Sequence, residues 1–504
     1  MADNKRIAKN TIFLYIRMFI IMGVTLYTSR VVLDKLGVDD FALYNVVGGV
    51  VGMLSFLNGT LSIGTSRFLT YELGTGNKQR LIETFNTAFY THVVLAVIII
   101  LLMETGGLWF MYNKLVIPPD RIDACFWVLQ ISILTTVISI TQVPYSASIM
   151  AYERMGIYAY VSIFEALGKL GVCYALNITE LDKLIVYASL LAVVQLSVAL
   201  YYRLYCVRTF DSCKLSLSFN RDILKGLLGF SSWNIMANVA EMLKLQGILM
   251  IVNIFLSPVI VAAQALSNQV STALMQFINN FRTAINPQII KLYAAGDKEA
   301  SKKLTIQTTV YCFDLTLLLA LPCIYTMKTL MGIWLVDVPE YAVVFAQIVF
   351  AGHIAGSFGA SFYTPMLAAN KIKTNSVAGV ICGFISFILL FIALKFEGNP
   401  LWVPSISILV FICLVLIIKP YILVKDVGYT WKEIIKCYID SIKVLTLSVA
   451  LSFPASYLSD GSLIQEIGVF FWTIISVCLS SYLFMPKETR IKLVSLVKNK
   501  IHYK

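Results

Sequence analysis

Charged side chains are scarce in this sequence of 504 residues: Asp, Glu, Lys and Arg together make up 13% of it. Soluble domains carry about 25% charged residues and roughly 45–50% apolar ones. Here 58% of the residues are hydrophobic and the mean hydropathy is +0.79. A soluble fold with so few charges has too little polar surface to cover itself. The composition therefore excludes an assembly of soluble domains and predicts a membrane protein that crosses the bilayer many times.

Sequence motifs of catalytic chemistry are missing as well. The chain has no GxxxxGK[ST] phosphate loop, no HExxH and no GxSxG, which excludes ATP hydrolysis by a P-loop and favours a protein that is not an enzyme. Its ten cysteines lie far apart and form no CxxC pair, so we interpret them as small apolar residues and expect no metal or other cofactor. The N-terminal apolar run has no A-x-A-like cleavage site, which predicts a first membrane span rather than a signal peptide.

Long apolar runs are abundant instead. A bilayer core of about 30 Å needs about 20 apolar residues per helix. Fourteen such runs occur along the chain, which predicts an all-α integral membrane fold. The predicted spans are Thr11–Val32, Phe41–Ser62, Thr84–Leu102, Phe126–Met150, Met155–Leu176, Leu184–Tyr205, Ile223–Lys244, Ile248–Met275, Leu304–Thr326, Ala342–Leu367, Asn375–Leu394, Leu401–Leu423, Ile442–Leu458 and Leu463–Phe484.

Positive charges follow an alternating pattern in the loops. The net charge is +12, and most of the 40 Lys and Arg residues lie in the two tails and in the even-numbered loops between these spans. Cytoplasmic loops carry the excess of Lys and Arg, so the pattern predicts that both termini are cytoplasmic. The odd-numbered loops hold most of the acids, such as Asp34, Asp39 and Glu340. We therefore attribute the positive charge to membrane topology and expect no nucleic-acid partner.

A weak internal repeat relates two parts of the chain at an offset of about 220 residues. The turn at 76–78 matches the turn at 296–298, and Pro144 matches Pro365. Six spans per repeat give both halves the same orientation, so an axis along the membrane normal relates them. We predict two six-helix lobes around a central cavity, an N-lobe over 1–210 and a C-lobe over 211–430, followed by a C-terminal span pair and a basic cytoplasmic tail over 431–504.

Polar residues recur on single faces of spans one, two, seven and eight. Lipid cannot satisfy such stripes, so they face the bundle interior or water. For span two, close helix packing through Gly48 and Gly52 is an equally good explanation. The candidates for substrate binding on these four spans are Arg17, Asn45, Asn234, Asn238, Glu241, Lys244, Asn253, Gln264 and Asn268.

Arg17 is the strongest single signal among them. Its guanidinium suits an anionic, phosphate-bearing group in the cavity. It lies about one turn into span one, so snorkelling to the cytoplasmic interface is the alternative. Arg67 and Arg282 end the segments after spans two and eight and are candidates for guarding the inner mouth, although topological charge explains them equally well.

Three groups at membrane depth are candidates for gating or ion coupling. Glu165 and Lys169 are four residues apart in span five, where a structural ion pair is the alternative. Asp314 in span nine has no basic neighbour on its own helix, which makes it a candidate carrier of a coupling ion, H⁺ or Na⁺. His353 lies on one face with Ser357, and we expect it to be hydrogen-bonded rather than bound to a metal.

Three stretches of the chain have the character of one transporter superfamily. They are Asn58–Asn77 (NGTLSIGTSRFLTYELGTGN), its counterpart Ile278–Lys303 (INNFRTAINPQIIKLYAAGDKEASKK), and Gln142–Leu170 across spans four and five. Together with the two six-span halves, they give a chain that resembles, along its whole length, the multidrug/oligosaccharidyl-lipid/polysaccharide exporter superfamily. It looks most like the bacterial flippases of polysaccharide units such as O-antigen or capsule repeats.

The resemblance carries its own expectations of fold and cargo. It implies a helical bundle with a cavity lined by spans one, two, seven and eight. It also implies that the last two spans form a lipid groove, as in the peptidoglycan-precursor flippases of the superfamily. The drug exporters of the superfamily often place an acid in span one. This chain has Arg17 there, which argues against export of cations.

Three hypotheses of function follow from the sequence. The first is a flippase that moves undecaprenyl-diphosphate-linked oligosaccharide units across the bacterial inner membrane by alternating access, coupled to an ion gradient. Its expected partners are the lipid-linked oligosaccharide, membrane lipid, and a polysaccharide polymerase and glycosyltransferases. The second is an ion-coupled exporter of small amphipathic molecules on the same fold. The third, a membrane glycosyltransferase or polymerase, is disfavoured because the longest outer loop, about 103–125, is short.

Overall fold

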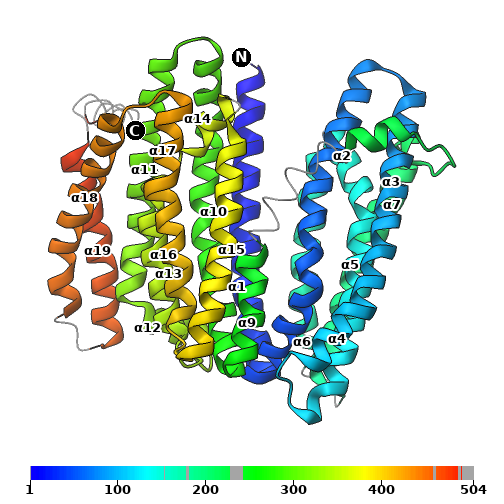
Figure 1. The fold of residues 1–504 in the computed structure, drawn as a ribbon, viewed down its shortest axis with the longest axis horizontal. Coiled ribbons are helices and arrows are strands. Elements are labelled where there is room, and N and C mark those ends of the chain that lie inside the picture. The colour runs from blue at the N-terminus through cyan, green and yellow to red at the C-terminus, as the bar shows by residue number, and fades with distance from the viewer. Residues whose placement is uncertain are drawn as a thin grey trace, which may run out of the picture. The chain divides into compact units, whose positions relative to one another are not determined.

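The computed structural model describes residues 2–152, 154–176, 181–227, 242–369, 371–457, 461–485 and 490. Every regular element in this part of the chain is a helix (Figure 1), as the sequence predicts. The chain divides into two compact units, which are described separately here. Unit 1 comprises Met1–Ala265, Trp334–Glu340 and Phe387–Val403, and unit 2 comprises Leu266–Ile333, Tyr341–Ser386 and Pro404–Lys504.

Unit 1 contains the helices of the first half of the sequence. They are α1 (Ala2–Gly52), α2 (Phe56–Thr75), α3 (Lys78–Leu102), α4 (Leu108–Asn113), α5 (Ile122–Ala151), α6 (Met155–Ala175), α7 (Lys183–Thr209) and α9 (Ile248–Phe255). Short 3₁₀ or π segments join some of them: η1 (Met53–Ser55), η2 (Met103–Gly107), η3 (Pro119–Arg121), η4 (Asp211–Cys213) and η5 (Leu243–Gly247). Helix α1 is broken at Gly37, where φ is 80°, so it consists of two helices that meet in the predicted first loop.

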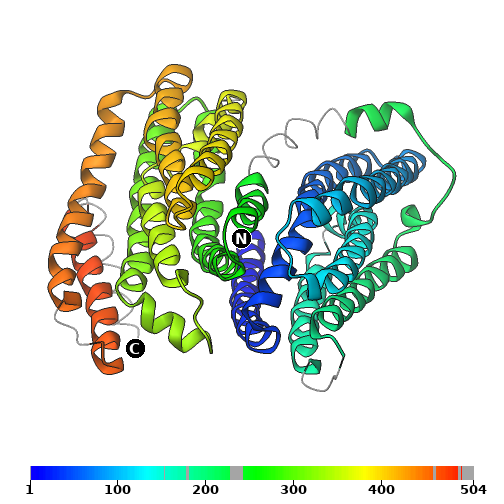
Figure 2. The same ribbon diagram turned by 60° about the horizontal axis from the view of Figure 1, so that its bottom comes forward.

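Unit 2 contains most of the second half. Its helices are α10 (Pro258–Ala294), α11 (Lys298–Tyr325), α12 (Met327–Trp334), α13 (Ala342–Ser357), α14 (Tyr363–Ala368), α15 (Ile372–Phe396), α16 (Trp402–Cys413), α17 (Lys419–Ile422), α18 (Trp431–Tyr457) and α19 (Leu463–Phe484). The start of α10 and of α16 and the end of α12 and of α15 belong to unit 1. Two π segments, η6 (Leu414–Ile418) and η7 (Leu423–Val427), flank α17. The last two helices, α18 and α19, pack side by side in both views (Figures 1 and 2).

Seven helical stretches of the described chain are long and apolar enough to cross a membrane. They are Lys78–Asn113, Pro119–Ala151, Lys183–Thr209, Lys298–Tyr325, Lys373–Phe396, Trp402–Val427 and Leu463–Phe484. Each of the seven overlaps a predicted span. The other predicted spans are more polar, are shorter, or include residues outside the described ranges, so the count of fourteen stays a prediction.

The predicted end of span two is wrong. Span two was expected to stop at Ser62, but helix α2 continues to Thr75 and carries Arg67 with it. Polarity rises after Ser62, yet no strong helix stop occurs before Gly76, whose φ of 71° ends the helix in the left-handed conformation that glycine tolerates. A helix therefore extends beyond the apolar run from which its length was predicted.

The predicted boundary between spans seven and eight is also wrong. Helical backbone continues through η5 and α9, and the chain breaks at Leu256 before α10 begins at Pro258. Proline suits the first turn of a helix and disfavours helical backbone at the residue before it. Asn253 consequently lies on α9, whereas Gln264 and Asn268 lie on α10, so these three residues do not form one stripe on one helix.

The two turns of the internal repeat have the same local geometry. Gly76 and Gly296 have φ angles of 71° and 85°. The next residue caps the following helix in both cases, because the side chains of Asn77 and Asp297 accept a hydrogen bond from a backbone N–H in the first turn of α3 and α11. The geometry supports the sequence match at this point, while the lobe boundaries at 210 and 430 stay predictions.

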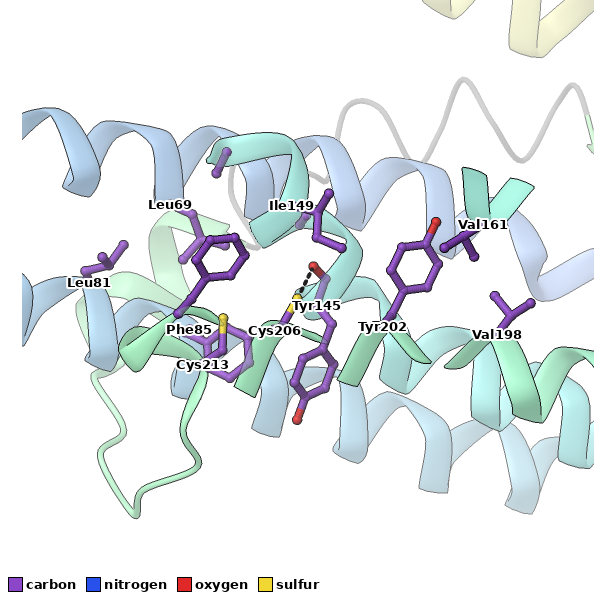
Figure 3. Close-up of a cluster of buried hydrophobic side chains, with 13 residues drawn as sticks. Leu69, Leu81, Phe85, Tyr145, Ile149, Val161, Val198, Tyr202, Cys206 and Cys213 are labelled. Carbon is purple, nitrogen blue, oxygen red and sulfur yellow. Dashed lines mark hydrogen bonds between the residues drawn. The ribbon is translucent and has the colours of Figure 1, made fainter. Parts of the chain in front are cut away.

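An aromatic-rich cluster holds the helices of unit 1 together. Its members come from α2, α3, α5, α6, α7 and η4 (Figure 3), and the labelled residues are Leu69, Leu81, Phe85, Tyr145, Ile149, Val161, Val198, Tyr202, Cys206 and Cys213. The Sγ of Cys206 lies 3.4 Å from the carbonyl oxygen of Tyr145, the contact drawn as a dashed line. Cys206 and Cys213 are fully buried, consistent with their interpretation as small apolar residues.

Candidate functional site

Six predicted site residues have side chains outside the described part of the structure. Asn234, Asn238 and Glu241 fall in the undescribed segment 228–241, and Arg17, Arg67 and Lys244 lie on described helical backbone with undescribed side chains. Their roles in substrate binding or gating stay predictions.

Asn45 and the glycines of span two lie where helices approach closely. The side chain of Asn45 donates a hydrogen bond of 2.7 Å to the carbonyl oxygen of Phe41 on its own helix. A Cβ atom added at Gly49 would lie 2.8 Å from Oε1 of Gln246 in η5. Glycine at this position lets α1 contact η5. A Cβ at Gly48 or Gly52 would make only an ordinary contact of 3.8 Å, so close packing through these two glycines stays a prediction.

Asn253 is committed to the backbone of a loop. It is 1% exposed, its Oδ1 accepts a hydrogen bond of 3.0 Å from the N–H of Val116, and its Nδ2 donates one of 3.3 Å to the carbonyl oxygen of the same residue. The Asn253 amide thus satisfies both backbone groups of Val116, as a neighbouring strand would in a sheet, and holds the segment after α4 in place. Of the other amides, Gln264 is buried and Asn268 is half-buried.

A basic cavity lies inside unit 2. It has a volume of about 70 Å³, which is room for roughly five water molecules. Three side chains that can carry positive charge line it: Arg282 from α10, His353 from α13 and Lys419 from the start of α17. Thr316 of α11 and Ser357 of α13 add hydroxyl groups, and the other lining residues are Met275, Ile278, Gly356, Gly359, Ala360 and Phe411. We call this set the basic cavity.

Two of the helical stretches that line the basic cavity are candidate membrane spans. Thr316 and Lys419 belong to the stretches Lys298–Tyr325 and Trp402–Val427, both long and apolar enough to span a bilayer. Arg282 is 12 residues before the end of α10, which corresponds to about 18 Å along a helix. Polar and ionisable side chains within membrane spans are costly unless they line a functional or water-filled space.

Close packing of glycines forms one wall of the basic cavity. Gly352, Gly356 and Gly359 follow each other on one face of α13 and the turn after it. A Cβ added at Gly352 would lie 2.6 Å from Ile408, and one at Gly356 would overlap the ring of Phe411. Only glycine therefore lets α16 and η6 lie against α13, and this approach places Phe411 and Lys419 at the cavity.

Arg282 has unused hydrogen-bonding capacity in the basic cavity. Its Nη1 donates a long hydrogen bond of 3.4 Å to Oδ1 of Asn279, while its Nε is buried and has no partner in the described part of the chain. No carboxylate is among the residues that line the cavity. A cation without a counter-ion in a medium of low dielectric constant attracts an anion strongly.

His353 is hydrogen-bonded, as the sequence predicts. Its Nε2 lies 2.6 Å from the hydroxyl oxygen of Ser271 on α10.

Lys419 is a residue that sequence reasoning does not single out. The available signal was a lysine followed by proline inside an apolar run; the lysine directly follows the π segment η6, and π bulges occur frequently at functional sites.

Glu165 and Lys169 form an ion pair within α6. The Nζ of Lys169 lies 2.6 Å from Oε1 of Glu165, and the two side chains are 47% and 30% exposed. The contact itself agrees with a structural salt bridge of the i, i+4 type. A role in ion coupling stays a prediction.

Asp314 lies on α11 in contact with the C-terminal helix pair. Its carboxylate lies near the hydroxyl of Ser481 on α19, and its Oδ1 is buried with no hydrogen-bond partner in the described part of the chain. The partner helix could not be identified from sequence, because the contact depends on how α19 packs against α11.

An ionic cluster that the sequence did not reveal ties together three loops of unit 1. The guanidinium of Arg121 donates two hydrogen bonds to Asp40, from Nε at 2.9 Å and from Nη2 at 2.6 Å, and a third from Nη1 to Asp182 at 2.6 Å. The three side chains are only 19–30% exposed. We call Arg121, Asp40 and Asp182 the loop clamp; all three lie in predicted outer loops.

The two acids of the loop clamp have different electrostatic surroundings. Burial raises the pKa of Asp40, and the charge and hydrogen bonds of Arg121 only partly oppose it. Burial also acts on Asp182, but the hydrogen bond from Arg121, the backbone N–H groups in the first turn of α7 and the charge of Arg121 outweigh it and lower the pKa of that carboxyl. The clamp thus favours an ionised Asp182 more strongly than an ionised Asp40.

Solved structures of membrane transporters share the fold of this chain. The inward closed conformation of the lipid II flippase MurJ matches with a TM-score of 0.72 at 11% sequence identity, over 94% of this chain and 98% of that one. An inward-facing multidrug resistance MATE family transporter of the MOP superfamily matches with a TM-score of 0.65 at 12% identity, over 80% and 96%. A MOP superfamily transporter from Pyrococcus furiosus matches with a TM-score of 0.60 at 12% identity, over 82% and 94%.

No protein-family model and no curated protein sequence matches the chain. The structural likeness at such low identity concerns the fold, and the proteins that share it are transporters, not enzymes. Together with the long apolar helices, it shows a multi-pass integral membrane protein whose described part is helical and has the same fold as these transporters.

Proposed function

We propose that this protein is a flippase that moves a prenyl-diphosphate-linked oligosaccharide across the bacterial inner membrane by alternating access. The observation that carries the proposal is the basic cavity: Arg282 and Lys419 line a cavity of unit 2 whose lining contains no carboxylate. A transporter of cationic drugs is expected to offer the opposite charge to its cargo. A lining of this kind suits an anionic group instead.

A diphosphate is the anion that fits both the chemistry and the fold. The guanidinium of Arg282 can donate two parallel hydrogen bonds to phosphate oxygens, and Lys419 adds a point charge. The described hydrogen bonds leave Nε of Arg282 available for such a contact. The prenyl chain of the substrate would stay in lipid while the sugar units occupy the polar interior, to which the predicted site residues Arg17 and Lys244 would contribute further charge.

The extent of the structural likeness supports a flippase over a drug exporter. The lipid II flippase MurJ matches 94% of this chain, whereas the MATE transporters match 80–82% of it. The alternative is an ion-coupled exporter of small amphipathic molecules. It is favoured by the number of multidrug transporters with this fold, among them a MATE transporter in complex with R6G.

Location and partners follow from the proposed function. A flippase for lipid-linked units would lie in the bacterial inner membrane with both termini in the cytoplasm, in agreement with the loop charges. It would receive its substrate from cytoplasmic glycosyltransferases and deliver it to a polysaccharide polymerase on the outer face.

Reconstitution tests the proposal directly. The protein would be placed in liposomes that contain an undecaprenyl-diphosphate-linked oligosaccharide with a fluorescent group on its terminal sugar. An impermeant quencher then reports which leaflet holds the label. We expect Arg282→Ala and Lys419→Ala each to slow flipping at least about tenfold, because each removes a charge-assisted contact in a low-dielectric site, and Arg282→Lys to retain partial activity.

A matched control separates the cavity from charge in general. Arg80 is 60% exposed at the start of α3, so Arg80→Ala should flip at the wild-type rate. Equal flipping by wild type and Arg282→Ala would refute the role of the cavity. No flipping by wild type, with export of a lipid-free cationic dye from the same liposomes, would favour the exporter.

A further inference from the structure

Asp314 is an acid within the apolar middle of α11, at the contact with the C-terminal helices. Helix α11 packs against α13 and α14 on one side and against α18 and α19 on the other. The hydroxyl of Ser481 on α19 lies near the Asp314 carboxylate. The acid is therefore placed between α11 and a helix pair outside the predicted internal repeat.

No cation compensates this carboxylate in the described part of the chain. Oδ1 of Asp314 is buried without a hydrogen-bond partner. The charged or titratable groups on the elements around α11 are engaged elsewhere or turned outward: His353 bonds to Ser271, Lys443 pairs with Asp440, and Arg490 donates to the carbonyl oxygen of Leu483 and lies over the ring of Tyr482. Tyr438 packs against Phe358, and Cys478 is exposed.

The same three-helix interface holds further polar groups without partners. The hydroxyl oxygens of Ser441 and Ser448 on α18 are fully buried and make no hydrogen bond within the described residues. Buried polar groups are normally hydrogen-bonded. These two hydroxyls are therefore available for new hydrogen bonds if the packing of α18 and α19 on α11 changes.

An ionised carboxylate at membrane depth without a cation carries a large desolvation penalty, which uptake of a proton removes. We propose that Asp314 binds and releases a proton at the contact between α11 and α19, and that the loss of this proton loosens α19 from α11. The chemistry is the transfer of one proton between a carboxyl oxygen and water, with no other bond formed or broken. The C-terminal helix pair would thereby respond to the proton gradient.

A proton fits this place better than a metal cation does. Hard cations require a shell of several oxygen ligands. The described side chains at Asp314 supply the carboxylate and the hydroxyl of Ser481 alone. This proposal names the ion and the helices that would move in the proposed flippase. Only the role of proton binding in transport rests on the proposed function.

Infrared difference spectroscopy tests proton binding without any transport substrate. The full-length protein in lipid nanodiscs would be titrated from acidic to alkaline pH, and the C=O band of a protonated carboxyl group recorded. We expect a band that disappears as pH rises, that is absent in Asp314→Asn at every pH, and that is retained in Asp314→Glu. Ser481→Ala should move its midpoint, because the hydroxyl is an electrostatic neighbour of the carboxylate.

Asp440→Asn is the matched control, since Asp440 is a carboxylate on α18 that is 40% exposed and paired with Lys443. It should leave the band unchanged. Hydrogen exchange on the same samples, corrected for the intrinsic effect of pH, should increase in α19 of wild type above the midpoint and not in Asp314→Asn.

A band that persists in Asp314→Asn, or no titrating band in wild type, would overturn the proposal. Loss of the band on addition of Na⁺ at constant pH would overturn the assignment to a proton alone. A failure of the flippase hypothesis would leave these spectra unchanged, so the two inferences fail separately.

Discussion

The loop clamp offers a stability prediction whose magnitude follows from its geometry. Arg121→Ala removes three short ionic hydrogen bonds, of 2.6–2.9 Å, from side chains that are 19–30% exposed. Exposed ion pairs contribute about 0.2–1 kcal/mol, whereas breaking a buried pair costs about 3–5 kcal/mol. The clamp lies between these limits, so we expect a loss of about 2–3 kcal/mol at neutral pH.

The pH dependence of this loss has a definite sign. Without Arg121, Asp40 and Asp182 lose their opposite charge, so both pKa values rise in the folded variant. A group whose folded pKa is raised contributes stability at low pH and loses it as pH rises through that pKa. In wild type, the lowered pKa of Asp182 stabilises the fold at neutral pH, and this stabilisation is lost as pH falls through that pKa. The difference between variant and wild type should therefore be largest at neutral pH and shrink toward the ordinary aspartate value of 3.8.

Thermal unfolding of the purified protein in detergent measures the effect at several pH values. We expect the melting temperature of Arg121→Ala to fall by about 2–3 °C at neutral pH, because the unfolding entropy of a chain of this length is about 1 kcal/mol/K, and Arg121→Lys to fall less. Lys214→Ala is the control, because Lys214 is 62% exposed in a pair with a 92% exposed Asp211, and it should change little. An unchanged melting temperature in Arg121→Ala, or a loss of equal size at pH 3.8 and pH 7.5, would refute this account of the clamp.

Three further predictions address packing, topology and the predicted cavity. Gly356→Leu should lower the free energy of unfolding by about 1–3 kcal/mol in the same melting assay, because the new side chain would overlap Phe411. Gly379→Leu is the control and should melt like wild type, because there is open space around Gly379. In a variant without natural cysteines, a cysteine at Asp337 should react with an impermeant maleimide from the periplasmic side and one at Lys298 should not, and the reverse result would contradict the predicted orientation. Arg17→Ala should abolish flipping in the liposome assay at normal protein levels, whereas normal flipping would mean that the side chain only snorkels.

Local chemistry explains why much of the helical architecture was predictable. Helices α5, α6, α7, α15 and α19 lie close to their predicted spans, since an apolar run of bilayer length with polar ends defines a helix with little help from its neighbours. The turns at Gly76 and Gly296 were marked in advance by a glycine followed by Asn or Asp, a combination that ends one helix and caps the next.

Predictions failed where composition and local stop signals disagreed. The apolar run of span two ends near Ser62, but the helix needs a residue such as Gly76 to end, so α2 is longer than the run. Between spans seven and eight, the Ser257-Pro258 break was a clear local signal that hydropathy concealed, because both sides of it are apolar. The separation of Asn253 from Gln264 follows from that break.

The sequence by itself determined an all-helical membrane chain and several polar residues at membrane depth, because hydrophobicity and helix signals act over a few residues. It did not determine which of those residues meet. Arg282 was singled out from sequence, yet its neighbours His353 and Lys419 come from helices about 70 and 140 residues away. Asp314 met Ser481, and Arg121 met Asp40 and Asp182, for the same reason. Such partners are selected by glycine-mediated contacts and helix register across the whole bundle, and only the tertiary structure contains that information.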